Sequence, residues 1–154
     1  MPVDVLIVLG LSGSVIGFAL WGGGKPEMLG AGIIALNLCI DFAVRAWVGQ
    51  WDFSTFSSRR FVIDLIEFTL LFSLALHANR VWPIVSAASQ LVAIAGSLAV
   101  WESGGGMRVA YWAVTQLPLF GQLAALAFGT VFHLRRQAVI GPYRDWRGAY
   151  ASRV

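Results

Sequence analysis

Five polar or ionisable residues lie inside two otherwise apolar stretches of the chain, and their spacing places them on two helix faces. Asn37, Asp41 and Arg45 are each separated by four residues and would share one face of a helix. Asp64 and Glu67 are three residues apart and would share a face of the next helix. Ionisable groups inside hydrocarbon are costly and commonly functional. Such a group could relay protons, hold a cation or bind a polar lipid headgroup.

A purely structural explanation of these residues stays open. Asp41 and Arg45 are one helical turn apart and can form a salt bridge within their own helix, which lowers the cost of inserting both. Asp64 can remain hydrated if it lies close to the interface, where a charge costs well below the ~2.5–3.5 kcal/mol of a central position. If the two helices are antiparallel neighbours, however, the acids and Arg45 lie at one depth and can share a pocket.

Two histidines form a second candidate site. His77 and His133 each follow an apolar stretch and are expected at the same depth, near the cytoplasmic surface. Two imidazoles at one depth could ligate a haem or another metal, whereas interfacial histidines with hydrated tips explain the same pattern. The single cysteine, Cys39, excludes an intramolecular disulfide. Two histidines and one cysteine are also too few for a closed zinc site built from Cys and His alone.

Five apolar stretches must position these residues. Of the 154 residues, 58% are hydrophobic and 12% are charged, whereas a soluble domain has about 25% charged residues. A helix of about 20 apolar residues crosses a ~30 Å hydrocarbon core and satisfies its own backbone groups there. The sequence therefore predicts an all-α integral membrane bundle of five transmembrane helices, at Val3–Trp21, Met28–Val48, Phe61–Ala78, Trp82–Trp101 and Val109–Phe132.

Basic residues indicate the orientation of such a bundle, because Lys and Arg are more frequent on the cytoplasmic side. The side of the C-terminus has Lys25, Arg80, Arg135, Arg136, Arg144, Arg147 and Arg153, and the side of the N-terminus has Arg45, Arg59, Arg60 and Arg108. This distribution predicts a periplasmic N-terminus and a cytoplasmic C-terminus. Residues 1–136 would form the transmembrane domain. Residues 137–154 would form a basic, aromatic cytoplasmic tail, either against the headgroups or as a solvated end.

Several further residues are expected to anchor or pack the helices. Arg80 is expected to face the cytoplasmic headgroups, and Trp82 and Trp101 to lie at the interface as anchors. Gln90 and Gln122 are expected to hydrogen-bond across helix contacts, since amides commonly join membrane helices in this way. The Gly13-xxx-Gly17 pair lets a neighbouring helix approach closely. We expect that neighbour to lie within the bundle.

The segment Phe61–Leu91 has a recognisable pattern. It has a basic start, an aspartate inside an apolar helix, and then "NRVWPI" and "ASQLVAI". It resembles uncharacterised small polytopic inner-membrane proteins of alphaproteobacteria that have a similar R-x-W-P, Q-L hairpin. The resemblance covers the third and fourth predicted helices, with a weaker likeness in the fifth. It implies a bacterial source and the same span assignment, and it implies no activity.

Three functions are compatible with these features. The sequence has no Walker A, HExxH, GxSxG or CxxC motif, which favours a non-catalytic protein without a resident cofactor, either an accessory subunit or an oligomeric scaffold. One alternative is a small oligomeric transporter or channel that uses the intramembrane acids. Another is a membrane redox protein that binds haem, quinone or lipid, with the histidines as ligands. The expected partners are membrane lipids and a homo-oligomer or larger membrane complex; nucleic acid is not expected, despite the net charge of +3.

Overall fold

The chain folds into a bundle of α-helices in the computed structural model, which describes residues 3–48, 58–103 and 108–146. Within these ranges it describes only the backbone of residues 3–5, 45, 48, 100, 103, 108–112 and 115. The helices are α1 (Val3–Gly22), α2 (Lys25–Val48), α3 (Ser58–His77), α4 (Trp82–Ser103) and α5 (Arg108–Ile140). The predicted all-α fold is therefore confirmed.

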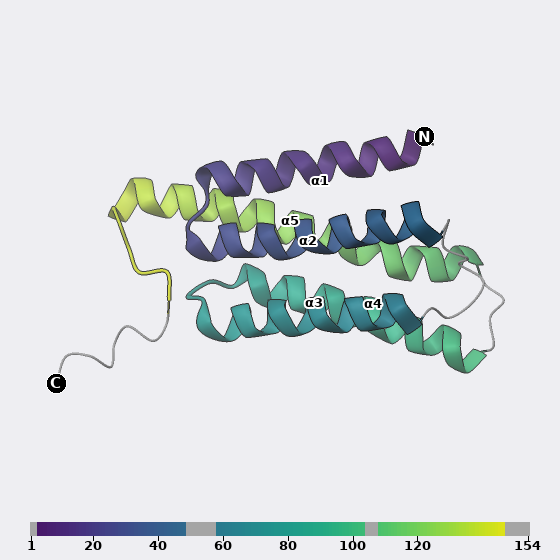
Figure 1. Cartoon of the computed structure of the whole chain (residues 1–154). Helices are drawn as coiled ribbons and strands as arrows, with labels where there is room; N and C mark the ends of the chain where they lie inside the picture. Colours follow the sequence, from purple (N-terminus) through teal and green to yellow (C-terminus); the bar gives the residue numbers. More distant parts are fainter. Residues whose placement is uncertain (1–2, 49–57, 104–107, 147–154) are drawn as a thin grey trace.

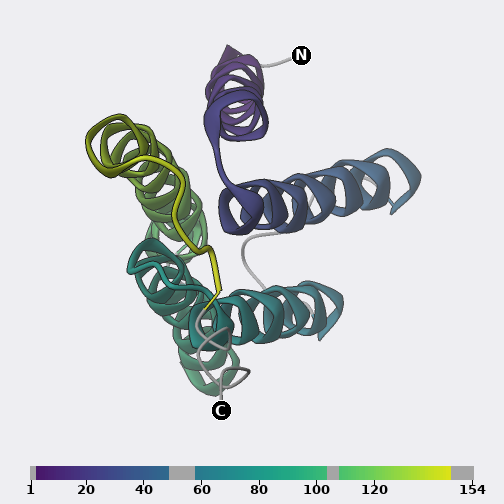
Figure 2. The ribbon, with the colours of Figure 1, turned by 90° about the vertical axis from the view of Figure 1, so that its left-hand side faces the viewer.

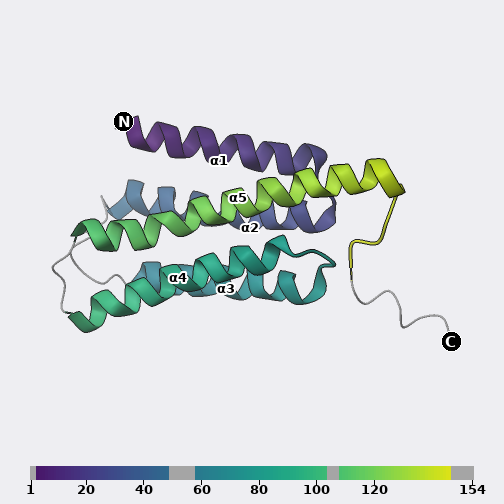
Figure 3. The ribbon, with the colours of Figure 1, turned by 180° about the vertical axis from the view of Figure 1, so that it is seen from behind.

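Consecutive helices run in opposite directions along one common axis (Figure 1). The views from the end and from behind (Figure 2 and Figure 3) show α2 and α3 on one side of the bundle and α4 and α5 on the other. α1 packs at the edge, against α2 and α5. One end of the bundle holds the start of α1, and we call it the N-terminal end. The opposite end holds the α1–α2 and α3–α4 connections and the end of α5, and we call it the C-terminal end.

The start of α2 and the end of α5 differ from the predicted boundaries for local reasons. α2 begins at Lys25 rather than Met28, because Pro26 suits a first turn and Glu27 accepts a hydrogen bond from the Gly24 N–H at 3.1 Å. α5 continues beyond Phe132 to Ile140 and ends where Gly141 takes a positive φ of 74°. The first residues of the predicted tail are therefore part of α5.

Polar side chains lie inside the bundle and large apolar side chains lie on its outer faces. The buried polar residues are Ser12, Glu27, Asp64, Glu67, Arg80, Ser86, Gln90, Ser97, Gln122 and Thr130. Exposed apolar side chains occur on every helix, with Leu6, Leu36, Ile66, Leu91 and Phe128 as examples. Three stretches are long and apolar enough to cross a membrane, namely Lys25–Val44, Trp82–Ala99 and Gln116–Ile140, and α1 has the shorter apolar stretch Leu6–Gly22. These features are those of a membrane-embedded protein.

Trp82 fills the centre of the C-terminal half of the bundle. Its indole ring packs between α2 and α5 at two glycines, because a Cβ at Gly30 would lie 2.1 Å from one ring atom and a Cβ at Gly129 would lie 2.3 Å from another. The same ring belongs to a core cluster that includes Ile34 and Leu126. The two glycines therefore allow α2, α4 and α5 to close around one aromatic side chain.

A buried ion pair joins the same helices next to this ring. The side chain of Glu27 is fully buried, and its Oε1 accepts hydrogen bonds from Arg80 Nε and Trp82 Nε1, both at 3.0 Å. Arg80 Nη2 also donates to Asp145 Oδ1 at 2.7 Å. The prediction that Arg80 and Trp82 are interface anchors is therefore wrong: their side chains are buried, since the Glu27 carboxylate in the bundle end holds them both. Trp101, by contrast, is exposed at the other end of the bundle.

The described part of the C-terminal segment, residues 141–146, folds back across the end of the bundle. The Asn79 N–H donates to the Asp145 carbonyl oxygen at 2.9 Å, and Ala78 forms an antiparallel bridge with Trp146. The Tyr143 ring lies 4.5 Å from the Arg80 guanidinium and 4.4 Å from that of Arg136. These contacts place the segment against the protein; residues 147–154 lie outside the described structure.

We predict that Arg80→Met strongly destabilises the bundle, because it leaves the Glu27 carboxylate buried without its cationic partner. The expected loss is about 3–5 kcal/mol in the free energy of unfolding, measured by SDS titration in mild detergent. Arg135→Met removes an exposed arginine of α5 and should change the free energy by less than about 0.5 kcal/mol. The double variant Glu27→Gln/Arg80→Met should recover much of the loss. A double variant no more stable than Arg80→Met would contradict the ion-pair explanation.

Candidate polar site between α2, α3, α4 and α5

The acidic residues of α2 and α3 come together inside the bundle. The two helices are antiparallel neighbours, so Asn37 and Asp41 on α2 face the residues of α3 at the same level. Asp64 and Glu67 turn inward from α3, with 4% and 3% of their surface exposed. The convergence that the residue spacing predicted is therefore present for these four residues. The side chain of Arg45 lies outside the described structure.

Arg60 links the two helices at this site. Its Nη1 lies 3.5 Å from Asp41 Oδ1, and its Nε lies 3.9 Å from Asp64 Oδ2 one turn along α3. Both distances exceed those of a normal hydrogen bond, so they describe ion pairs through space. Arg60 is not among the site residues that the sequence predicts. Its position four residues before Asp64 places both residues on one helix face, and this spacing is the feature of the sequence that identifies Arg60.

Glu67 has one hydrogen-bonded and one unpaired carboxylate oxygen. Its Oε2 accepts a hydrogen bond from Asn37 Nδ2 on α2. Its Oε1 is buried and has no hydrogen-bond partner in the described part of the chain. Because a buried polar atom normally has a partner, this oxygen is the one atom of the Glu67 carboxylate that the described residues leave able to accept a hydrogen bond or a proton.

Two amides extend the site from α3 to α5. Gln122 Nε2 donates to Gln90 Oε1 at 2.7 Å, and Gln90 Nε2 donates to Asp64 Oδ1 at 3.1 Å. The two glutamines therefore hydrogen-bond across helix contacts as the sequence predicts. The donors therefore run in series, from Gln122 to Gln90 and from Gln90 to the Asp64 carboxylate. Asp64 Oδ2, like Glu67 Oε1, is buried without a hydrogen bond among the described residues.

The balance of charge at this site is negative among the side chains that the structure describes. Three carboxyl groups, from Asp41, Asp64 and Glu67, lie near one guanidinium, that of Arg60. Like charges repel strongly where water is excluded. Among these described side chains, a proton or another positive charge would lower the repulsion. No described group of three or more His, Cys, Asp and Glu residues is placed to hold a metal ion.

The two histidines make separate local contacts. His77 is exposed, and its Nδ1 lies 2.8 Å from the Ser73 carbonyl oxygen on its own helix. His133 Nδ1 lies 3.0 Å from Arg80 Nη2 and 2.8 Å from the Tyr143 hydroxyl. Because an arginine nitrogen can only donate, His133 Nδ1 is the acceptor there. Burial raises the pKa of Tyr143, which keeps its hydroxyl protonated and able to donate to the same atom.

Comparisons with known proteins returned no relative of this chain. No family model matches it, no curated protein matches it, and no solved structure matches it. The two polar networks and the surface of the bundle are therefore the features that bear on function.

Proposed function

We propose that the chain is a multi-pass integral membrane protein and that all five helices span the bilayer. The distribution of polarity supports this proposal, because apolar side chains cover the outside and charged groups are enclosed. α3 has four charged residues that lower its hydropathy, but Asp64 and Glu67 face inward. The outer face of α3 is apolar, with Val62, Leu65, Ile66, Leu70 and Phe72 exposed.

The orientation follows from the two ends of this bundle. Exposed tryptophans occur at both ends, Trp21 at the C-terminal end and Trp47 and Trp101 at the N-terminal end, as in the aromatic belts of membrane proteins. Exposed Lys25, Arg135, Arg136 and Arg144 lie at the C-terminal end, which favours a cytoplasmic location for it. The resemblance of Phe61–Leu91 to alphaproteobacterial proteins supports a bacterial inner membrane.

For this protein we propose a role as a small, non-catalytic subunit of proton-coupled transport, in which the polar site takes up a proton. The observation that supports this role is the buried Glu67 Oε1 without a hydrogen-bond partner among the described residues. A proton neutralises one of the three carboxyl groups at this site. A proton is favoured over a metal ion because the described carboxyl groups do not form a metal-binding group.

Access to the site is expected from the N-terminal end of the bundle. Arg60 and Asp41 lie between that end and Glu67 and provide polar groups along the way. On the other side of Glu67, the buried residues of α3 are Leu71, Leu74 and Ala75. A proton that enters from the periplasmic side therefore needs a change in packing or a partner subunit to leave towards the cytoplasm.

A scaffold function is favoured by a separate observation on α1. A Cβ at Gly10, Gly13 or Gly17 would have no atom within 4 Å. The Gly13-xxx-Gly17 pair therefore faces out of the bundle, and not towards another helix of the chain as we expected. Since such pairs allow close helix contacts in membranes, α1 is the surface that we propose for association with a second copy or a partner helix.

We predict that a C-terminal fusion reports a cytoplasmic C-terminus and an N-terminal fusion a periplasmic N-terminus. With five spans the two ends lie on opposite sides of the membrane. A green fluorescent protein fused after Val154 should fluoresce, and alkaline phosphatase at the same position should be inactive. Active phosphatase at the C-terminus would contradict the orientation, and both termini on one side would contradict five spans.

We predict that Glu67→Gln abolishes one proton-binding event of the purified protein. In infrared difference spectra recorded across a pH titration, the wild type should show the C=O band of a buried carboxylic acid, and Glu67→Gln should lack it. In vesicles with a pH-sensitive dye, proton flux driven by a potassium diffusion potential should fall at least tenfold. Glu102→Gln, an exposed control on α4, should match the wild type. Equal proton flux in all vesicles, with or without protein, would contradict the role in proton transport and would be compatible only with the scaffold function.

We predict that Gly17→Leu disrupts association through α1, because a bulky side chain prevents close approach of a second helix. The fraction of oligomer, measured by crosslinking in mild detergent, should decrease severalfold. Gly32→Leu, which changes a glycine of α2 that also has free space around it, should leave the fraction unchanged. The same fraction of oligomer in both variants would argue against α1 as the contact surface.

A further inference from the structure

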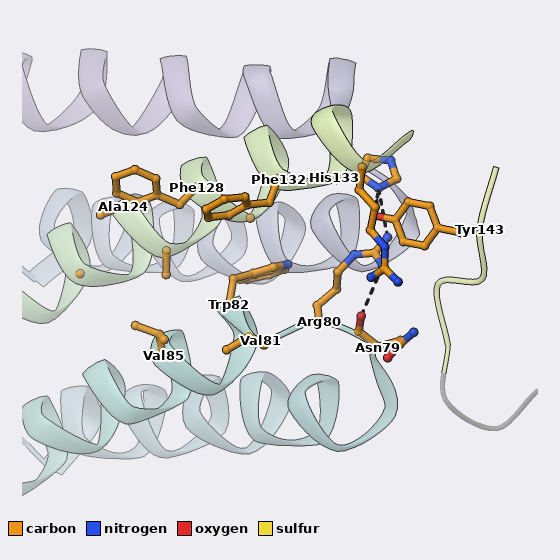
Figure 4. A pocket seen from close by; sticks show the side chains of 14 residues that line it. Asn79, Arg80, Val81, Trp82, Val85, Ala124, Phe128, Phe132, His133 and Tyr143 are labelled. Carbon is orange, nitrogen blue, oxygen red and sulfur yellow. Dashed lines mark hydrogen bonds between the residues drawn. The ribbon is translucent and has the colours of Figure 1, made fainter. Parts of the chain in front are cut away.

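A groove of about 680 Å³ opens on the outer face between α4 and α5 at the C-terminal end of the bundle (Figure 4). Its walls are apolar along most of their length. Val81 of the α3–α4 connection and Val85 of α4 form one wall, and Phe128 and Phe132 of α5 form the other. The side chains of Val81, Phe128 and Phe132 are more than 60% exposed.

Small residues of α5 give the groove its depth. Gly121, Ala124 and Ala125 line it, and Gly129 lies against the Trp82 ring. The stretch from Gly121 to Phe132 is about 16 Å long at a rise of ~1.5 Å per residue. This length is close to the ~15 Å of hydrocarbon in one leaflet of a bilayer. The apolar part of the groove therefore has the length of one acyl chain.

The end of the groove is polar, and its Arg136 forms no ion pair among the described residues. Arg80 is already paired with Glu27 and Asp145. Arg136 is exposed, its guanidinium lies 4.4 Å from the Tyr143 ring, and it forms no ion pair with a described residue. The Tyr143 ring therefore holds Arg136 at the mouth of the groove, where its N–H groups remain available to an anion.

We propose that this groove binds an anionic phospholipid of the cytoplasmic leaflet, with the phosphate at Arg136 and one acyl chain along Phe132 and Phe128. The inference rests on the proposed insertion into the membrane. Basic pockets between transmembrane helices bind anionic headgroups on the cytoplasmic side. A free phosphate would use only the polar end of the groove. A partner helix has a diameter of about 10 Å and would not need a cation at one end of an apolar groove.

The test is native mass spectrometry of the purified full chain with equal amounts of phosphatidylglycerol and phosphatidylcholine. The wild type should retain phosphatidylglycerol preferentially. Arg136→Gln should reduce the retained phosphatidylglycerol about fivefold, since one basic residue near an anionic headgroup contributes about 1 kcal/mol. Arg135→Gln, which changes the adjacent exposed arginine outside the groove, should retain more than half of the wild-type amount.

A second variant tests the apolar part separately. Ala124 lines the groove and its side chain is exposed, so Ala124→Phe should fill the groove and reduce phosphatidylglycerol binding while the unfolding midpoint stays the same. Unchanged binding in Ala124→Phe, equal loss in the two arginine variants, or complete competition by inorganic phosphate would overturn the proposal. Release of the protein from membranes by alkaline carbonate would instead refute the proposed membrane insertion. A protein that stays inserted and shows no preference for phosphatidylglycerol refutes the lipid site alone.

Discussion

The carboxylate of Glu27 is fully buried, so the protein itself must supply every group that neutralises and hydrogen-bonds it. Arg80 supplies the charge, and Trp82 and the Gly24 N–H supply further donors. These partners come from the α1–α2 connection, the α3–α4 connection and the start of α4. Arg80 in turn holds Asp145 of the C-terminal segment. The C-terminal end of the bundle therefore depends on one buried ion pair, because breaking it leaves a charge without compensation.

The buried carboxylate of Glu67 at the acidic site has fewer hydrogen-bond partners among the described residues than that of Glu27. Both oxygens of Glu27 accept hydrogen bonds. Among the described residues only Oε2 of Glu67 does so, and the contacts of Arg60 with Asp41 and Asp64 are longer than hydrogen bonds. A complete network holds a structure in one arrangement, and an incomplete one has capacity for a proton. This contrast is the physical basis for assigning a structural role to Glu27 and a functional role to Glu67.

The Glu27 network, the acidic site and the proposed lipid groove lie along the same bundle. Trp82 donates to Glu27 on one side and contacts Gly129 on the other, so the contact that closes the interior also shapes the groove on the surface. The C-terminal end of the bundle, which this network closes, is the end that we propose to be cytoplasmic, with Arg136 at the proposed headgroup site. The acidic site lies nearer the opposite end of the bundle.

The sequence by itself determined the helical class, most helix boundaries and which residues share a face, because apolar length and helical periodicity are local properties. That is why Asn37, Asp41, Asp64 and Glu67 were found before their contacts were known. Only the tertiary structure decided which side chains meet across helices. Arg60 at the acidic site, Glu27 beneath Arg80, and the outward face of Gly13 and Gly17 all depend on how each helix is rotated. That rotation is set by close packing, such as Trp82 between Gly30 and Gly129, which joins residues far apart in the chain and leaves no periodic signal in it.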